Sequence, residues 1–267
     1  MVFLSDYGLD DEFVGIVHRV IVSEAPGVRV VDLNHRIRAH DVRAGSLALW
    51  RCGPWLRGSV VLAVVDPGVG TPRRAVALEV AGAGVTLVGP DNGLLAPAAR
   101  ALGGVTAAVE LLALPVAAQD SGATFAGRDL FAPVAARLAS GEWTLADAGV
   151  AVDPSSLMGG EVRIAAAGVD GVVACEVLWV DRFGNAQLNT RGEGVSDTVQ
   201  VAAGGGCVGA RRVAAFGDLA SGELGLVTDS YGLLALALDR APAASRLGLH
   251  EGDAVRLSPA RPGEDRR

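Results

Sequence analysis

The segment Val64-Val65-Asp66-Pro67-Gly68-Val69-Gly70-Thr71-Pro72-Arg73-Arg74 decides how the first half of the chain is expected to fold. It completes a run of β-branched residues that predicts a buried strand over residues 60–65. Pro-Gly-Val-Gly then forces a turn at the carboxyl end of that strand, where open α/β sheets bind their ligands. Asp66 is therefore expected at this candidate ligand-binding edge of the sheet, with Arg73 near enough in the chain to pair with its carboxylate. The alternative is a turn-forming Asp66 whose arginine neighbours are solvated.

Strand and helix signals alternate around this segment. Strands are expected over residues 2–5, 28–33, 60–65, 75–80 and 85–88, and helices over residues 10–23, 42–50, 96–101 and 130–139. Asp41 is the expected N-cap of the second helix, and Gly141 ends the last one. This pattern predicts an α/β domain over residues 1–155, with a mixed sheet flanked by helices.

The character of the sequence changes at Asp153-Pro154-Ser155-Ser156. Short β-type runs spaced by Gly and Asp follow, over residues 161–164, 171–180, 198–201, 225–228 and 254–257. They predict a smaller, mainly antiparallel β domain over residues 161–260.

Composition excludes several functional classes. The chain contains no lysine, so Schiff-base chemistry, pyridoxal phosphate catalysis and a P-loop lysine are ruled out. The formal net charge of −7 argues against general nucleic-acid binding. A dinucleotide fingerprint is missing as well, because Arg73 stands where the third glycine would be.

Compartment and metal content can also be anticipated. No apolar run approaches the roughly 18 residues of a membrane span, and the chain opens without a basic leader, so neither membrane nor secretion is expected. Three scattered cysteines suit a reducing cytoplasm. His35 and His40, near Asp32 and Asp41, fit no common metal motif. We therefore expect a cytoplasmic protein with no metal and no cofactor.

Five segments, in this order, carry a resemblance to a known family. They are Phe3-Leu4-Ser5-Asp6-Tyr7-Gly8, the Asp66 segment, Val88-Gly89-Pro90-Asp91-Asn92-Gly93-Leu94-Leu95, Thr124-Phe125-Ala126-Gly127-Arg128-Asp129 and Asp181-Arg182-Phe183-Gly184-Asn185. Together they resemble the S-adenosylmethionine hydrolases (adenosine-forming), the hydroxide adenosyltransferases related to the fluorinase and chlorinase. The resemblance runs from Phe3 to about Arg256. It implies a compact β-barrel-like second domain, and a homotrimer in which that domain completes the site of a neighbouring subunit.

The resemblance also implies a reaction: S-adenosyl-L-methionine is hydrolysed to adenosine and L-methionine by in-line attack of activated water on the ribose 5′ carbon. Family hydrolases use an Asp, an Arg and a His at the water site, and Asp66 and Arg73 match the first two. Halogenases of the family carry Tyr at the Asp66 position, which places this chain with the hydrolases. The third position holds Ala126, whose methyl group forms no hydrogen bond.

Ala126 leaves three interpretations open. The chain is a natural variant in which Asp66 and Arg73 suffice or another group such as His40 replaces the histidine; or it is a deliberately substituted enzyme; or it is a binding protein for S-adenosylmethionine or adenosine with negligible turnover. Losing one acid/base contact lowers a rate by roughly 10²–10⁴-fold rather than abolishing it, which favours a slowed hydrolase. A halogenase-like adenosyltransferase is a further alternative, which Asp66 disfavours.

Substrate-binding positions follow from the resemblance alone. Asp6 matches the residue that accepts both ribose hydroxyls, Asp181 and Asn185 match those that read the methionine ammonium and the adenine edge, and Phe183 matches an aromatic that stacks on the base. Ser230 matches the residue that holds the methionine carboxylate, with Tyr231 after it as in hydrolases. His40 is expected on the ribose side of the pocket, or else is a surface residue before a helix, and Phe125 completes the set. Read without the resemblance, residues 181–185 form a turn between strands.

Overall fold

The structure is a computed structural model, and it describes residues 1–112 and 124–260. The chain divides into two compact units, Met1–Glu161 (unit 1) and Val162–Arg267 (unit 2). In the described residues, no helix combines the length and the apolar character needed to cross a membrane.

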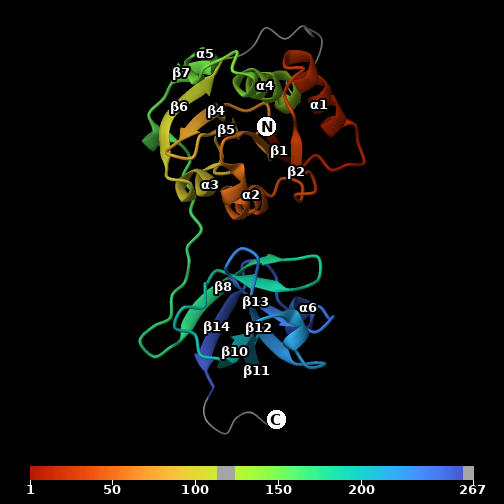
Figure 1. Ribbon diagram of the computed structural model, residues 1–267, viewed down its shortest axis with the longest axis vertical. Helices are drawn as coiled ribbons and strands as arrows, with labels where there is room; N and C mark the ends of the chain where they lie inside the picture. The colour runs from red at the N-terminus through yellow and green to blue at the C-terminus, as the bar shows by residue number, and fades with distance from the viewer. Residues whose placement is uncertain (113–123, 261–267) are drawn as a thin grey trace. The chain divides into compact units, whose positions relative to one another are not determined.

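Unit 1 contains a seven-stranded mixed sheet in the order β2-β1-β3-β5-β4-β6-β7 (Figure 1). Strands β2, β1, β3 and β5 are parallel, whereas β4, β6 and β7 pair antiparallel with their neighbours. The strands are β1 Val2–Ser5, β2 Val31–Asn34, β3 Val60–Val64, β4 Ala75–Val80, β5 Val85–Pro90, β6 Val105–Leu111 and β7 Gly149–Ala151.

The helices of unit 1 form a layer on each face of the sheet (Figure 1). Helix α1 (Phe13–Glu24) packs with α4 (Ala132–Ser140) on one face, beside the short α5 (Leu145–Ala148), and α2 (Val42–Leu56) packs with α3 (Ala96–Ala101) on the other. Side chains alternate along each strand, so Phe3, Leu62 and Val64 join the core under α1 and α4. The predicted α/β domain with a mixed, helix-flanked sheet is confirmed.

Several predicted boundaries in unit 1 were wrong. Helix α1 begins at Phe13 rather than at residue 10, and β2 begins at Val31 rather than at residue 28. Strand β2 starts late because Val31 pairs with Val2, where β1 begins. Helix α2 runs past its predicted end at residue 50, through Pro54, because its last residue, Leu56, is buried. Strands β6 and β7 and helix α5 were not predicted.

The predicted helix ends have simple chemical causes. The side chain of Asp41 accepts a hydrogen bond from Ala44 N–H at 2.8 Å, which caps α2 as expected. Gly141 ends α4 in a left-handed conformation with a φ of 76°, also as expected.

Unit 2 is a closed barrel in the order β10-β11-β12-β13-β9-β8-β14, antiparallel except where β11 meets β12. Its elements are β8 Val173–Val180, β9 Ala186–Leu188, β10 Thr198–Ala203, β11 Gly206–Val213, β12 Leu224–Thr228, β13 Leu234–Leu238, α6 Ala243–Leu247 and β14 Ala254–Pro259. The predicted mainly antiparallel β domain is confirmed. The strand predicted over residues 161–164 was wrong, because none of these residues lies in a strand. The next residue, Ala165, forms an isolated bridge with Thr190.

Candidate active site

Asp66 lies two residues beyond the carboxyl end of β3, at the edge of the sheet where its place in the sequence predicted it. The guanidinium of Arg73 donates hydrogen bonds to the Asp66 carboxylate. Nε donates to Oδ1 at 2.8 Å and to Oδ2 at 3.0 Å, and a terminal nitrogen also donates to Oδ2. The Asp66 side chain is 5% exposed and that of Arg73 is 15% exposed. Arg73 also lies over the ring of Phe131, 5.2 Å from its centroid. A bidentate, largely buried pair of this kind fixes the direction of both groups.

The turn after Asp66 is held by groups from both sides. Asn92 Nδ2 donates to the carbonyl oxygen of Val65 at 2.8 Å, which ties the end of β3 to the residues that follow β5. Thr71 Oγ1 donates to the carbonyl oxygen of Gly68 at 2.6 Å and closes the turn itself. These contacts explain why the Pro-Gly-Val-Gly segment presents Asp66 in one orientation.

Asp6 lies at the same edge of the sheet, because β1 and β3 are parallel neighbours with Ser5 opposite Val64. Its Oδ2 accepts the backbone N–H of His40 at 2.8 Å. His40 has a φ of 68°, a left-handed conformation that is uncommon outside glycine, although histidine is among the residues enriched in it. The contact between Asp6 and the His40 backbone therefore accompanies a backbone conformation that the sequence pattern did not signal.

A cavity of about 550 Å³ collects most of the predicted residues of unit 1. Its wall includes Asp6, His40, Asp66, Phe125 and Ala126, with Arg73 behind Asp66. Arg128, at the end of the Ala126 segment, pairs with Asp129 at 2.5 Å and lies over the Phe125 ring, 5.2 Å from its centroid.

Two aromatic residues of this cavity were not assigned a role from the sequence. Tyr7 and Phe13 both line it, and each meets Phe125 edge to face, with ring centroids 5.5 and 5.2 Å apart. Tyr7 follows Asp6 directly, so its place within the Ser-Asp-Tyr-Gly segment was the signal that could have identified it. Burial, followed by the nearby carboxylates of Asp6 and Asp66, raises the pKa of Tyr7, against the opposing effect of Arg73.

The remaining predicted residues belong to unit 2, on two loops of the barrel. Asp181 Oδ1 accepts the backbone N–H groups of Phe183 and Asn185 at 2.8 and 2.9 Å, and its Oδ2 accepts the Asn185 side chain at 2.8 Å. This is the turn between β8 and β9. Phe183 projects from it and is 71% exposed, so its ring is available to stack.

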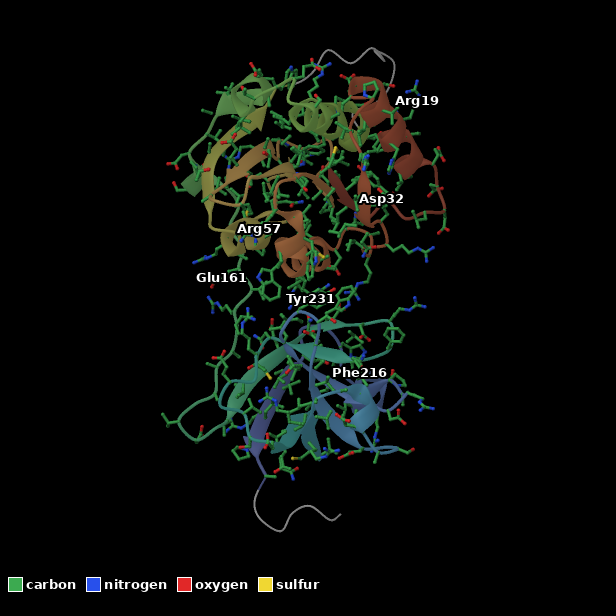
Figure 2. The ribbon with its side chains drawn as sticks, viewed as in Figure 1. Arg19, Asp32, Arg57, Glu161, Phe216 and Tyr231 are labelled. Carbon is green, nitrogen blue, oxygen red and sulfur yellow. The ribbon has the colours of Figure 1, made fainter. Side chains whose placement is uncertain are left out.

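The second loop, between β12 and β13, is built in the same way. Asp229 Oδ1 accepts the N–H groups of Tyr231 and Leu233 at 2.8 and 3.0 Å, and Gln187 Nε2 of strand β9 donates to Oδ2. Ser230 and Tyr231 are consequently exposed on the loop, and Figure 2 shows Tyr231 at one end of the barrel. The Gln187 contact joins this loop to the strand that follows the first loop.

The start of α6 joins the same end of the barrel. Ala244 N–H donates to the carbonyl oxygen of Gly184 at 2.8 Å, and Arg240 has a left-handed φ of 50°. Residues 181–185 are thus linked to the start of α6 directly, and residues 229–232 are linked through Gln187 to strand β9, which follows the first loop. In unit 1 the structure brings the predicted residues together at one cavity, and in unit 2 it places them on two loops of the barrel.

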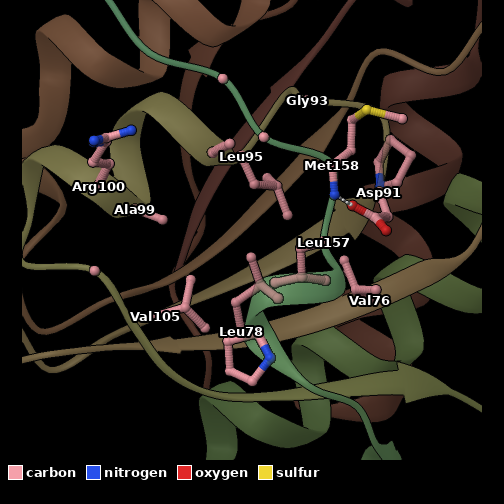
Figure 3. Close-up of a pocket in the computed structure, with 16 residues that line it drawn as sticks. Val76, Leu78, Asp91, Gly93, Leu95, Ala99, Arg100, Val105, Leu157 and Met158 are labelled. Carbon is pink, nitrogen blue, oxygen red and sulfur yellow. Dashed lines mark hydrogen bonds between the residues drawn. The ribbon is translucent and has the colours of Figure 1, made fainter.

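A second cavity, of about 280 Å³, lies in unit 1 beneath residues 154–160 (Figure 3). Apolar side chains such as Val76, Leu78 and Leu157 line it. Its carboxylate, Asp91, accepts Met158 N–H at 2.7 Å and pairs with Arg74 at 2.6 Å. Because these contacts fasten residues 154–160 to the sheet, we assign this cavity to packing.

One group of potential metal ligands occurs in the described residues. The nitrogens Nε2 of His18 and His35 lie 2.8 and 3.0 Å from the same oxygen of Asp32, and Ser5 Oγ lies 2.8 Å from His35 Nδ1. These are donor types that zinc accepts. However, both imidazoles already face one carboxylate oxygen, so an ion-pair cluster accounts for the arrangement. His40, which the sequence placed near His35, is not part of it.

Comparisons with known proteins agree with this architecture. The family model described as the SAM hydroxide adenosyltransferase N-terminal domain matches residues 1–149, and that of the C-terminal domain matches residues 175–256. An (R)-S-adenosyl-L-methionine hydrolase from Salinispora tropica is 49% identical over 96% of each chain. One from Thermus thermophilus is 44% identical over 96% of this chain and 98% of its own.

A more distant relative and a solved structure also match almost the whole chain. A fluorinase from Actinoplanes sp. is 27% identical over 97% of each chain. The crystal structure of an uncharacterized conserved protein from Thermotoga maritima matches with a TM-score of 0.88 and 32% identity, over 97% of this chain and all of that one. With both family models matched and relatives above 40% identity along almost its full length, the chain belongs to the SAM hydroxide adenosyltransferase family.

Proposed function

We propose that the protein hydrolyses S-adenosyl-L-methionine to adenosine and L-methionine by in-line attack of an activated water on the ribose 5′ carbon. The observation that carries this proposal is the bidentate, largely buried Asp66–Arg73 pair on the wall of the 550 Å³ cavity. Relatives of 44–49% identity that bear the name (R)-S-adenosyl-L-methionine hydrolase support the same substrate and products.

The main task of the protein in this reaction is to position a water molecule behind the ribose 5′ carbon. The substrate is a sulfonium, so methionine leaves as a neutral thioether when the C–S bond breaks and its electron pair returns to sulfur. Asp66 orients the water and takes its proton as the new C–O bond forms. Each carboxylate oxygen has two acceptor sites, so Asp66 can bind the water while Arg73 holds it. Arg73 also stabilises negative charge that develops on the water oxygen.

Asp6 supplies the ribose contact. Two hydroxyl groups on one carboxylate form a charge-assisted pair of hydrogen bonds, which selects a ribose over a deoxyribose. The His40 N–H already bound to Oδ2 fixes the carboxylate before the substrate arrives. His40 itself and Phe125 complete the nucleoside side of the cavity.

Unit 2 supplies the remaining substrate contacts in this proposal. Phe183 stacks on the adenine, Asp181 and Asn185 bind the methionine ammonium and the adenine edge, and Ser230 and Tyr231 hold the methionine carboxylate. We place these residues in the site of a neighbouring subunit of a homotrimer, with residues 1–155 and 161–260 as the two domains. Light scattering on a size-exclusion column measures the oligomeric state, and a monomeric active enzyme would contradict the shared site.

We further propose a cytoplasmic location. The free thiols of Cys52, Cys175 and Cys207, none of which forms a disulfide, support it.

The decisive experiment follows the origin of the new oxygen atom. Purified protein is incubated with S-adenosylmethionine in ¹⁸O-labelled water, and adenosine is followed by mass spectrometry. We expect labelled adenosine above the enzyme-free background, and its loss in Asp66→Ala. A parallel reaction with chloride tests the halogenase alternative, which requires 5′-chloro-5′-deoxyadenosine as product.

Ala126 favours a second candidate function, a binding protein for S-adenosylmethionine or adenosine with negligible turnover. Its methyl group offers no hydrogen bond to a water in the cavity. Tight binding without labelled adenosine would support this alternative. Ala126→His then separates a disabled enzyme, which regains turnover, from a dedicated binding protein, which does not.

A further inference from the structure

The wall of the cavity formed by residues 125–127 lacks a side-chain polar group. Phe125 presents an aromatic ring, Ala126 a methyl group and Gly127 no side chain at all. A water held by Asp66 alone has one fixed direction and remains free to rotate about it. In-line attack on a carbon atom needs a second contact that aims a lone pair of the water at that carbon.

Tyr7 carries a hydroxyl group to this wall. It lies one residue beyond Asp6, at the edge of the sheet that also presents Asp66, and its ring is held edge to face against Phe125. Phe13 supports it from another side, with ring centroids 6.0 Å apart. The ring is therefore fixed by packing, and the hydroxyl position follows from that of the ring.

Gly127 makes room for this hydroxyl. A Cβ atom built on Gly127 would lie only 1.9 Å from Tyr7 Oη and 3.0 Å from Cζ, distances that real side chains do not adopt. The backbone at Gly127 is not left-handed, so its conformation does not require a glycine. Close approach of the tyrosine hydroxyl accounts for the absence of a side chain here.

The Tyr7 hydroxyl has unused hydrogen-bonding capacity. Among the described residues, no side chain or backbone group forms a hydrogen bond with Tyr7 Oη, although Tyr7 lines the same cavity as Asp6 and Asp66. Burial and the two carboxylates raise the pKa of Tyr7, so the group is a neutral phenol at neutral pH. A neutral phenol both accepts and donates a hydrogen bond.

We propose that Tyr7 Oη is the second contact of the attacking water, on the wall where Ala126 provides none. This inference rests on the proposed hydrolysis and assigns a residue to it. One water hydrogen is directed to Asp66 and the other to Tyr7 Oη, which leaves a lone pair for the ribose carbon. The proton released in the reaction goes to Asp66, and Tyr7 keeps its own, so Tyr7 acts by positioning the nucleophile and not as the base.

The primary test is Tyr7→Phe, which removes one oxygen atom and keeps the ring contacts. We expect kcat to fall by about 10²-fold, the effect of a misplaced nucleophile, with KM and the melting temperature close to wild type. Tyr7→Leu serves as the matched comparison, because it removes the ring as well and should also destabilise unit 1. Equal kcat values for wild type and Tyr7→Phe would overturn the proposal.

A second set of variants separates positioning from packing. In the Tyr7→Phe/Ala126→His double variant, the imidazole restores a polar group to the same wall, so kcat should recover to within a few-fold of Ala126→His alone. A loss that stems from packing would persist in the double variant, and that result would refute the assignment. Gly127→Ala should displace the hydroxyl and reproduce the kcat defect of Tyr7→Phe.

The two proposals fail in different ways. A wild-type protein that forms no labelled adenosine would refute the hydrolysis and with it the role of Tyr7. A wild-type protein that turns over, with a Tyr7→Phe variant of the same kcat, would refute only the role of Tyr7.

Discussion

The Asp66–Arg73 pair offers a quantitative test of how the site is held together. Arg73→Met keeps much of the side-chain volume near Phe131 but removes the cation, and so leaves a carboxylate of 5% exposure without its partner. Two opposite charges about 4 Å apart interact by roughly 4 kcal/mol at the effective dielectric constant of partly buried sites. Breaking a buried pair by removing one partner typically destabilises a protein by about 3–5 kcal/mol. We therefore expect unit 1 of Arg73→Met to lose about 3 kcal/mol at pH 7.

The neutral partner of this variant isolates the coupling. In Arg73→Met/Asp66→Asn the unpaired charge is gone, so the double variant should be more stable than Arg73→Met. The coupling energy from the full double-mutant cycle should be about 2–4 kcal/mol. The Arg211–Glu223 pair of the barrel has a similar two-nitrogen geometry, with Nε and Oε1 2.9 Å apart, but it is exposed, and its cycle should give a much smaller value.

Urea unfolding followed by tryptophan fluorescence measures these energies. Trp179 is the tryptophan of unit 2, so a Trp179→Phe background leaves Trp50, Trp55 and Trp143 as reporters of unit 1. We expect the urea midpoint to shift while the slope of the free energy of unfolding against urea concentration stays unchanged. A coupling energy for Asp66 and Arg73 as small as that of the exposed pair would refute the view that burial makes this contact strong.

Three further predictions concern other parts of the molecule. Asp6→Asn should raise KM for S-adenosylmethionine by about 10–100-fold, because a charged hydrogen-bond acceptor for the ribose is lost; an unchanged KM in steady-state kinetics would exclude that role. Although burial opposes it, contact with two imidazoles lowers the pKa of Asp32 below its usual 3.8, so its stabilising effect is present above that pH and is lost below it. Asp32→Asn should thus have a lower melting temperature than wild type at pH 7, corresponding to a loss of less than about 1 kcal/mol in the free energy of unfolding. In thermal unfolding scans well below pH 3.8, the difference between the two proteins should vanish. Gly184→Ala should destabilise unit 2 by at least about 1–3 kcal/mol, since Gly184 has a φ of 82° and its added Cβ would lie 2.4 Å from Pro242. Trp179 fluorescence during urea unfolding measures this loss of stability. A variant as stable as wild type would show that the turn rearranges to accept the Cβ without cost.

The parts of the site that follow strand ends could be predicted from the sequence. Asp6 and Asp66 each come within two residues of the end of a short, mainly apolar strand, and β1 and β3 are parallel neighbours in the sheet. Their side chains therefore share an edge, as the pattern indicated. The partnership of Arg73 with Asp66 was also accessible, because the turn between them is short and closed.

Contacts that depend on packing or on unusual backbone conformations could not be predicted in this way. The left-handed His40, whose N–H binds Asp6, carries no pattern signal, and neither does the approach of Tyr7 to Gly127. Strand β13 was not predicted, because its sequence Leu-Ala-Leu-Ala-Leu, Leu234–Leu238, has neither the β-branched residues that marked β3 nor an alternation between a polar and an apolar face. Helix α2 passed its predicted end because burial of Leu56 outweighed the break that Pro54 implies.

The barrel loops show why a turn motif and a binding motif are hard to separate in a sequence. Asp181 and Asp229 each use one carboxylate oxygen to accept two backbone N–H groups, which is the work of a turn residue. The same contacts fix the loops and leave Phe183 and Tyr231 exposed. A carboxylate oxygen engaged by two N–H groups still carries the negative charge that an ammonium group requires. The turn and the binding site are therefore two consequences of one hydrogen-bonding arrangement, and evidence for the first does not count against the second.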